Sequence, residues 1–554
     1  MAFKVDLYLD ARLSKTIELE YPVTIKEIVS SERLTPFQTI SFKLNNKFVN
    51  SSKLIVEDST LVCVGFKSTE GFRIYQDSTI FIMAKAFYKL YNKSMRLVVE
   101  HSIGDGIFCE AFGDEEFTEK DLQAVKSEML KIVEKELYVE EIEMGLEEAK
   151  NIFIKQGRND VVRNLHYNHK GFVPVFRCGG YYDYFIRQLC DNTGLIRDFE
   201  LNINPPGFVI RYPNKRTGKI KEEFNYPKKL FQVHQEADKW LNIFDVHNVS
   251  DVNDKIEHFD IQNVILVEEA LHEKKIVNFA KEITDKGNVR AVFIAGPSSS
   301  GKTTFAKRLS TQLHVNGLVP LILGMDDYFL PRTHTPLNKK GEPDFESITA
   351  IDLPYFNEHL SALLQGKEID LPKYNFLSGT REKTNTLLQM KENNILIVEG
   401  IHCLNELVSE AIPKEQKVLV YISCLNQLNI DDHNRITTTY FRKLRRIVRD
   451  NNFRGYTAEM TLERWPAITE GENKNIFPFQ ENADIMFNSG LTYEVNVLKK
   501  HVLPLLYRIS KYSPIYCEAQ KMIFLVEHML DIPDDMVPSN SLLREFIGGS
   551  IFKY

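Results

Sequence analysis

A glycine-rich segment that leads into a lysine and two threonines is the pattern in this chain with the clearest chemistry. It reads Gly296-Pro-Ser-Ser-Ser-Gly-Lys-Thr-Thr304 and fits G-x-x-x-x-G-K-[ST]. In such a loop the backbone N–H groups converge on phosphate, the lysine reaches the β- and γ-phosphates, and the first threonine hydroxyl ligates Mg²⁺. We therefore predict an ATP site formed by Gly296, Pro297, Ser298, Ser299, Ser300, Gly301, Lys302, Thr303 and Thr304, with Lys302 catalytic and Thr303 a ligand of Mg²⁺.

Acidic residues follow two further apolar runs. Asp326 and Asp327 come after Leu321-Ile-Leu, and Glu399 ends Ile395-Leu-Ile-Val-Glu. Carboxylates at the carboxyl ends of parallel strands lie at the edge where α/β sheets hold ligands. Asp326 is a candidate base for an acceptor hydroxyl and, with Glu399, a candidate Mg²⁺ ligand. The alternative is that Asp326 and Asp327 only cap a loop or the next helix.

An arginine-rich stretch supplies candidate cations for a triphosphate. Spacings of three and four residues place several of its arginines on one face of a helix, and they are Arg442, Arg445, Arg446, Arg449 and Arg454. Guanidinium groups suit the charge that develops on a transferring phosphoryl group. The alternative is a solvated or salt-bridged helix surface.

The elements that must position these residues alternate between apolar strands and helices. Four strand candidates lie within residues 286–510: Ala291-Val-Phe-Ile-Ala, Val319-Pro-Leu-Ile-Leu, Asn394-Ile-Leu-Ile-Val and Lys417-Val-Leu-Val-Tyr-Ile. This alternation predicts an α/β fold in which helices cover both faces of a parallel sheet.

The remaining residues divide into four further regions. Residues 1–66 alternate as in a small β-rich module, with a short helical pattern at Thr24-Ile-Lys-Glu-Ile-Val. Residues 67–225 read as an α+β domain with helices at Ile80 to Tyr91 and Glu119 to Lys155. Residues 226–285 read as a helical connector, and the apolar tail, 511–554, is expected to dock on the body.

Composition limits the classes of function. The chain has 554 residues, 43% of them hydrophobic, and a net charge of −7. It therefore lacks the overall positive charge that would favour binding to duplex DNA or an anionic membrane. No apolar run reaches the length of a membrane span, and the residues after Met1 alternate as in a strand, so we expect a cytoplasmic protein. Seven scattered cysteines without a C-x-x-C pair predict reduced, mainly buried thiols.

The ordered motifs of residues 286–510 resemble uridine kinases of the phosphoribulokinase/uridine kinase family. The resemblance rests on the glycine-rich loop, Asp326-Asp-Tyr-Phe, Phe345-Glu, Leu371-Pro-Lys-Tyr374, Val398-Glu-Gly-Ile and Arg445-Arg-Ile-Val-Arg-Asp-Asn-Asn-Phe-Arg454-Gly. It implies that Asp326 is the base for a 5′-hydroxyl and Glu399 a magnesium-site acid. It further implies a substrate pocket of Asp326, Tyr328, Glu346, Tyr374 and Arg381, catalytic roles for Arg446 and Arg449, and contact of Arg454 with ATP.

Two positions depart from that family. Uridine kinases have a base-contacting histidine five residues after the pocket tyrosine, where this chain has Gly379, and they usually have aspartate where it has Glu346. Phosphoryl transfer to a hydroxyl is therefore implied more strongly than recognition of a pyrimidine.

The amino-terminal half resembles parts of threonyl-tRNA synthetase. Residues 1–66 are similar to the small TGS module, a β-grasp fold. Residues of about 75–200 are similar to the second additional, editing domain, through Asp77-Ser-Thr-Ile-Phe, His101-Ser-Ile-Gly-Asp-Gly and Arg177-Cys-Gly-Gly-Tyr-Tyr-Asp-Tyr. The metal ligands of that family correspond here to Asp77, Phe81, Phe185 and Leu189, so the resemblance implies a domain without its metal and without editing hydrolysis.

These features lead to two hypotheses. The first is an ATP- and Mg²⁺-dependent kinase that phosphorylates a hydroxyl of a nucleoside, of the uridine or cytidine kind, or of a related small metabolite. The second is a nucleotide-switched regulator associated with RNA or tRNA, which the mild net charge disfavours. A homo-oligomer is compatible with both.

Overall fold

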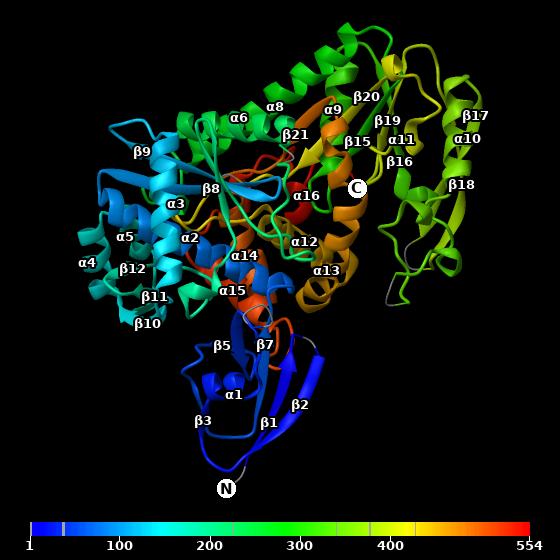
Figure 1. Cartoon of the computed structure of the whole chain (residues 1–554). Helices are drawn as coiled ribbons and strands as arrows, with labels where there is room; N and C mark the ends of the chain where they lie inside the picture. The colour runs from blue at the N-terminus through cyan, green and yellow to red at the C-terminus, as the bar shows by residue number, and fades with distance from the viewer. Residues whose placement is uncertain are drawn as a thin grey trace.

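The computed structural model describes residues 3–10, 12–35, 39–224, 226–338, 341–375, 378–426 and 428–553. Figure 1 shows a small amino-terminal sheet at one end of the molecule and a larger body that holds the remaining sheets and most of the helices. No helix in these ranges is long and apolar enough to cross a membrane.

The amino-terminal module is a mixed sheet with one short helix. Its strand order is β2-β1-β7-β4-β5, in which β1 and β7 are parallel and the other neighbours are antiparallel. Alternate residues of β1 and β7, such as Val5, Leu7 and Leu61, are buried against Ile25 of the helix. The elements are β1 (Phe3–Leu9), β2 (Arg12–Leu19), β3 (Val23–Thr24), α1 (Ile25–Ser31), β4 (Ser41–Leu44), β5 (Lys47–Val49), β6 (Leu54–Ile55) and β7 (Ser59–Val64).

The second region contains two antiparallel sheets and a long buried helix, α2 (Thr69–Tyr91). One sheet has the order β13-β14-β9-β8 and the other the order β10-β11-β12. The other elements are β8 (Met95–Ile103), β9 (Gly106–Gly113), α3 (Glu119–Glu134), β10 (Glu140–Gly145), α4 (Leu146–Gln156), α5 (Asn159–His166), β11 (Phe172–Cys178), β12 (Tyr181–Asp183), β13 (Glu200–Asn204) and β14 (Gly207–Arg211).

One helix predicted for this region is wrong. The pattern from Glu119 to Lys155 forms two helices, α3 and α4, separated by the strand β10. Ile142 and Met144 alternate with glutamates and face Val175 and Val173 of β11 in an antiparallel pair. In β10 apolar residues recur at every second position, and this strand pattern outweighs the helical propensity of the glutamates between them.

Residues 226–285 contain three helices, which are α6 (Lys228–Phe244), α7 (Val249–Glu257) and α8 (Ile261–Asp285). Figure 1 shows α6 and α8 in the upper part of the view. Ile276, Ala280 and Ile283 of α8 pack against the sheet that follows, so this helix is part of the cover of that sheet as well as a connection.

The body is built on a five-stranded parallel sheet of order β16-β19-β15-β20-β21. All four predicted strands are confirmed, and a short fifth strand, β21, was not predicted. Val292 and Ile294 face α8 and α9, whereas Phe293 faces α10, so helices cover both faces. The elements are β15 (Ala291–Ala295), α9 (Lys302–Val315), β16 (Val319–Gly324), α10 (Leu353–Leu364), β17 (Glu368–Asn375), β18 (Thr380–Gln389), β19 (Asn394–Glu399), α11 (Glu406–Ser409), β20 (Lys417–Ser423), α12 (Thr438–Arg454), α13 (Ala458–Asn475), β21 (Ile485–Asn488) and α14 (Glu494–Leu506).

The carboxyl-terminal segment packs against the body through α15 (Tyr516–Glu527) and α16 (Arg544–Ile547). Ala519, Met522, Leu543 and Phe546 are buried in the same core as α12 and α14. Figure 1 shows α16, in red, next to α12. The seven cysteines are all free thiols, and only Cys517 is not fully buried.

A buried polar cluster joins the second region to the loop before α12. The Arg158 guanidinium donates to Asp160 at 2.8 Å, to Asp183 at 2.6 Å and to Asp431 at 3.3 Å. In the same loop the Asp432 carbonyl accepts from the backbone N–H of Val99 at 2.7 Å. This contact falls where the pairing of β8 with β9 shifts register, so an irregular strand of the amino-terminal half receives the loop.

Candidate functional site

The glycine-rich loop leaves the buried central strand β15 and enters α9 at Lys302. A Cβ atom on Gly296 would lie 2.1 Å from the Ile422 carbonyl oxygen of the neighbouring strand β20. Only glycine fits at this approach, so the turn stays close to the sheet edge. Gly301 has a φ of 82° and starts the helix, whose first N–H groups have no partner within the helix.

Lys302 is folded back over the loop. Its ammonium group donates to the carbonyls of Gly296 at 3.0 Å and Pro297 at 3.4 Å. Burial lowers the pKa of Lys302, and the nearby Asp326 and Glu399 carboxylates oppose that shift. The predicted cation and the two predicted acids therefore share one buried, electrostatically coupled site.

The two acidic strand ends lie side by side. Gly324 of β16 pairs with Glu399 of β19 in the parallel ladder, and Asp326 follows in the short 3₁₀ turn Met325–Tyr328. Burial raises the pKa of Asp326, and it raises the pKa of Glu399 to about 7. A carboxylate with a raised pKa near the working pH suits proton transfer better than one fully exposed to water.

The donor set at this edge fits a magnesium ion that also contacts phosphate. The Thr303 hydroxyl donates to Glu399 Oε1 at 3.3 Å, while Glu399 Oε2 is buried and accepts no hydrogen bond from the described residues. The described ranges contain no group of three or more His, Cys, Asp or Glu side chains able to hold a metal alone. A hard cation here would take oxygen ligands from Thr303, Glu399 and Asp326 and the rest from phosphate or water, as Mg²⁺ usually does.

The arginines of α12 separate into two kinds. Arg445 is fully buried, with its guanidinium 2.8 Å from the equally buried Glu494 and bonded to the Ser489 carbonyl at 2.7 Å. Arg442 donates to the Ser298 carbonyl at 2.8 Å and pairs with Glu472, whose carboxylate also accepts from the Ser298 N–H at 3.0 Å. These two arginines support the phosphate loop from behind.

Arg446, Arg449 and Arg454 lie on the more open side of α12. Arg446 donates to the Ser298 hydroxyl, and all three pair with Asp450, at 3.1 Å, 3.0 Å and 3.8 Å respectively. Burial lowers the pKa of Arg446 to about 10, so this guanidinium has lost hydration that a bound anion would replace. Spacing along the helix could not separate these three from Arg442 and Arg445.

The predicted acceptor residues are only partly brought together. Glu346 lies near Arg446, and burial, followed by the charge of Glu472, raises its pKa to about 7. Tyr374 on β17 packs its ring 5.6 Å from Phe329. Arg381 on β18 pairs with Asp352 at 3.0 Å. These side chains come from one loop and one hairpin beside the acidic edge.

Tyr328, a predicted substrate residue, is fully buried, and its hydroxyl is 3.0 Å from His359 Nδ1, so its side chain packs against α10. Its neighbour Asp327, to which no role was given, accepts from the Tyr374 N–H at 3.2 Å and from Lys373. Asp327 thus ties the hairpin to the end of β16.

Gly379 is held in a conformation that suits glycine. Its φ is 72°, and a Cβ atom there would lie 2.9 Å from Arg332 Cβ and 2.8 Å from Arg332 Nε. The Arg332 N–H also donates to the Gly379 carbonyl at 2.8 Å. The place where uridine kinases have a histidine is therefore next to an arginine side chain.

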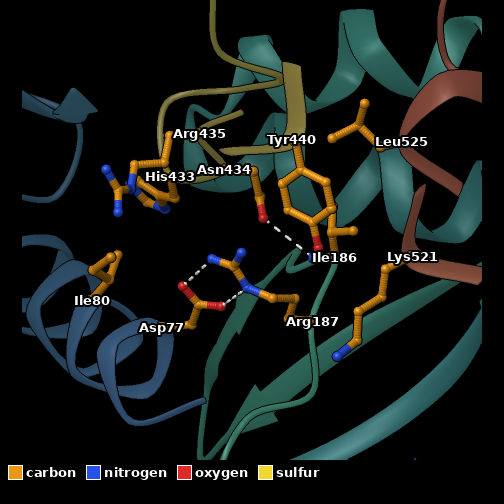
Figure 2. A pocket seen from close by; sticks show the side chains of 10 residues that line it. All are labelled: Asp77, Ile80, Ile186, Arg187, His433, Asn434, Arg435, Tyr440, Lys521 and Leu525. Atoms are coloured by element: carbon orange, nitrogen blue, oxygen red, sulfur yellow. Dashed lines mark hydrogen bonds and ion pairs between the residues drawn. The ribbon is translucent and has the colours of Figure 1, made fainter. Parts of the chain in front are cut away.

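Four residues that the sequence resemblance aligned with metal ligands lie together in the second region. Phe81 and Phe185 have ring centroids 6.0 Å apart, Leu189 is buried in the same core, and Asp77 pairs with Arg187. Beside them is a cavity of about 20 Å³, with Asp77 and Arg187 in its wall, as Figure 2 shows. That volume holds about one water molecule.

Three histidines of this half lie apart from those residues. His101 is buried and stacks on His234 with centroids 3.6 Å apart, while His166 and His169 are exposed. Cys178 is buried on β11.

Comparison with known proteins gives matches to the carboxyl-terminal half. Residues 291–496 match the Phosphoribulokinase / Uridine kinase family, so the chain carries a domain of that family. The uridine kinase of Lactobacillus helveticus is 29% identical over 198 residues, which are 36% of this chain and 85% of that protein. The uridine kinase of Anoxybacillus flavithermus is 28% identical and covers 36% of this chain and 84% of that protein. A solved structure described as a possible uridine kinase from Bacillus stearothermophilus is 19% identical, covers 39% of this chain and 98% of that one, and has a TM-score of 0.27.

Proposed function

We propose that residues 286–510 form a kinase that transfers the γ-phosphoryl group of ATP to a hydroxyl of a nucleoside, of the uridine or cytidine kind, or of a related small metabolite. The observation that carries the proposal is the coupling of Lys302, Asp326 and Glu399 at one sheet edge, beside the start of α9. The match of residues 291–496 to a kinase family supports it.

In the proposed reaction Asp326 accepts the proton of the acceptor hydroxyl. The hydroxyl oxygen forms a bond to the γ-phosphorus as the bond from that phosphorus to the β,γ-bridging oxygen breaks, and ADP leaves. The raised pKa of Asp326 matches this role, because a weakly acidic carboxyl holds the proton more readily. Lys302 balances charge on the β- and γ-phosphates.

Two further groups complete the proposed machinery. Thr303, Glu399 and Asp326 would hold Mg²⁺, which neutralises charge on the phosphates when bound. Arg446, Arg449 and Arg454 would exchange part of their pairing with Asp450 for the oxygens of the triphosphate, where their bidentate donors stabilise the charge of the transition state. Glu346, Tyr374 and Arg381 would contact the acceptor, and Tyr328 would act from behind them.

For the amino-terminal half we keep the predicted domains as part of the proposal. Residues 1–66 would be a TGS-like module, 67–225 an editing-like domain and 226–285 a connector, with 511–554 a docked tail. The contact between Phe81 and Phe185 supports the loss of the metal site. Association with RNA rests on the resemblance alone, and the net charge of −7 gives it no support.

The experiment is an ADP-release assay over a panel of nucleosides, ribose derivatives and other hydroxylated metabolites. We expect acceptor-dependent ADP release that Lys302→Ala abolishes and Asp326→Asn lowers by about 100-fold or more. Asp327→Asn is the matched control, since it changes the adjacent carboxylate, which bonds to β17, and we expect activity within a few-fold of the unaltered chain. Full turnover in Asp326→Asn would exclude Asp326 as the base.

A further inference from the structure

A carboxylate from the carboxyl-terminal segment lies on the start of the phosphate-loop helix. Glu545 Oε2 accepts hydrogen bonds from the Thr304 hydroxyl at 2.7 Å and from the Thr304 backbone N–H at 3.3 Å. Thr304 is the third residue of α9, so its N–H lies in the first turn, where the N–H groups point out of the helix end. The two residues are 241 positions apart in the sequence.

The donors that Glu545 uses are the ones a nucleotide needs. The last residue of the phosphate loop and the first N–H groups of its helix are where bound phosphate oxygens are expected, and the helix dipole favours negative charge there. The Glu545 carboxylate is likewise an anion whose oxygens accept hydrogen bonds. The contact therefore lies where the proposed ATP site would bind phosphate. ATP and Glu545 cannot both accept hydrogen bonds from the same Thr304 donors.

The segment that carries Glu545 is anchored on both sides. Leu542 is fully buried in the core of α9, and a Cβ on Gly301 would lie 3.1 Å from it. On the other side the Phe546 carbonyl accepts from Asn452 of α12 at 3.3 Å, and Arg445 lies over the Phe546 ring. The backbone around Glu545 is thus fixed between the phosphate loop and the arginine helix.

The Glu545 side chain itself is free of that anchoring. It is half-buried, and its neighbour Arg544 bonds to the carbonyls of Asp534 and Val537 at 2.7 Å and 2.6 Å, which holds the turn without involving the carboxylate. A rotation of the Glu545 side chain breaks its two hydrogen bonds to Thr304 while Leu542 and Phe546 remain in place.

We propose that Glu545 is a built-in competitor for nucleotide phosphate, so that the carboxyl-terminal segment lowers the affinity of the chain for ATP. The inference rests on ATP binding at the phosphate loop. In the nucleotide-free protein the carboxylate occupies Thr304 and balances part of the charge of Lys302. Binding of ATP displaces it, and the displaced carboxylate adds an opposing negative charge near the triphosphate.

The test measures ATP affinity of the full chain by calorimetry, with Mg²⁺ and without acceptor. Variants Glu545→Gln and Glu545→Ala remove the charge, and Asp535→Asn removes one from an exposed position of the same segment as a matched control. We expect both Glu545 variants to bind ATP about tenfold more tightly, and the control to stay within about twofold.

Three results would overturn the proposal. Equal or weaker ATP binding by both Glu545 variants, with Lys302→Ala still abolishing binding, would refute the competition alone. A gain of the same size in Asp535→Asn would reduce the effect to general charge. Absence of ATP binding in every variant would remove the proposed function together with the competition. Glu545→Gln preserves the shape of the side chain, and a thermal unfolding curve that matches the unaltered chain shows that the fold is retained.

Discussion

Replacement of Arg445 should separate the supporting arginines of α12 from those proposed to contact ATP. Arg445 and Glu494 are both 0% exposed, and the guanidinium also donates to the carbonyls of Ser489 at 2.7 Å and Ser299 at 3.4 Å. Arg445→Met removes one partner of a buried ion pair and leaves the Glu494 carboxylate without its compensating charge. Such a loss costs about 3–5 kcal/mol, so we expect the free energy of unfolding to fall by about that amount.

The protein has two tryptophans, which allows the change to be followed in the relevant part of the fold. Trp465 lies in α13, and the Arg442 guanidinium is 5.4 Å from the centre of its ring. In a Trp240→Phe background, urea unfolding followed by tryptophan fluorescence reports the surroundings of Trp465. This matters because a chain with several domains need not unfold in one step.

Two control variants make the reasoning refutable. The double variant Arg445→Met, Glu494→Leu removes both charges, so it should recover most of the lost stability. Arg449→Ala leaves Asp450 paired with Arg446 and should cost about 1 kcal/mol or less while lowering phosphoryl transfer. A loss below about 1 kcal/mol in Arg445→Met, or an equal loss in the double variant, would refute the account of a buried supporting pair.

Three further outcomes are expected. Gly379→His should lower the melting temperature, because a left-handed φ costs a non-glycine residue about 1–2 kcal/mol and the new Cβ overlaps Arg332. Adding Arg332→Ala to that variant should restore part of the melting temperature. An unchanged melting temperature in Gly379→His alone would contradict the clash. The raised pKa of Glu346 favours its protonated form in the folded state, so its contribution to stability is complete below pH 4.5 and is lost as the pH rises to about 7. Urea unfolding across that range should show a loss of stability that is larger in the unaltered chain than in Glu346→Gln by about 3 kcal/mol; parallel curves would refute it. Arg158→Met should lower the midpoint of thermal unfolding by several degrees, since three carboxylates lose their shared cation, whereas Arg177→Met, an exposed pair with Glu140, should change it little.

Much of the fold could be predicted from local patterns. The four strands at Ala291, Val319, Asn394 and Lys417 are confirmed because each is an uninterrupted apolar run, as a strand buried on both faces requires. The strand at Ile485–Asn488 has only four residues, too few for a period to stand out. The strand β10 was hidden by glutamates that favour helix between two true helices.

In the candidate site, too, local sequence patterns predict some residues and miss others. The phosphate loop and the acids Asp326 and Glu399 follow from motif and strand ends, because both are properties of neighbouring residues. The roles of Glu472 and Glu545 depend on contacts across 174 and 241 positions, which no local pattern contains. The burial of Tyr328 likewise depends on His359 of another helix.

The loop before α12 makes the two halves of this protein inseparable. Asp431 and Asp432 are buried where Arg158 and Val99 of the amino-terminal half contact them, and the next described element is the helix that carries the arginines. A fragment cut at residue 286 would expose these acids to water and lose the support at the start of that helix. Cutting the chain at the predicted boundary of the kinase-like domain would therefore break contacts that the loop before α12 makes with the amino-terminal half.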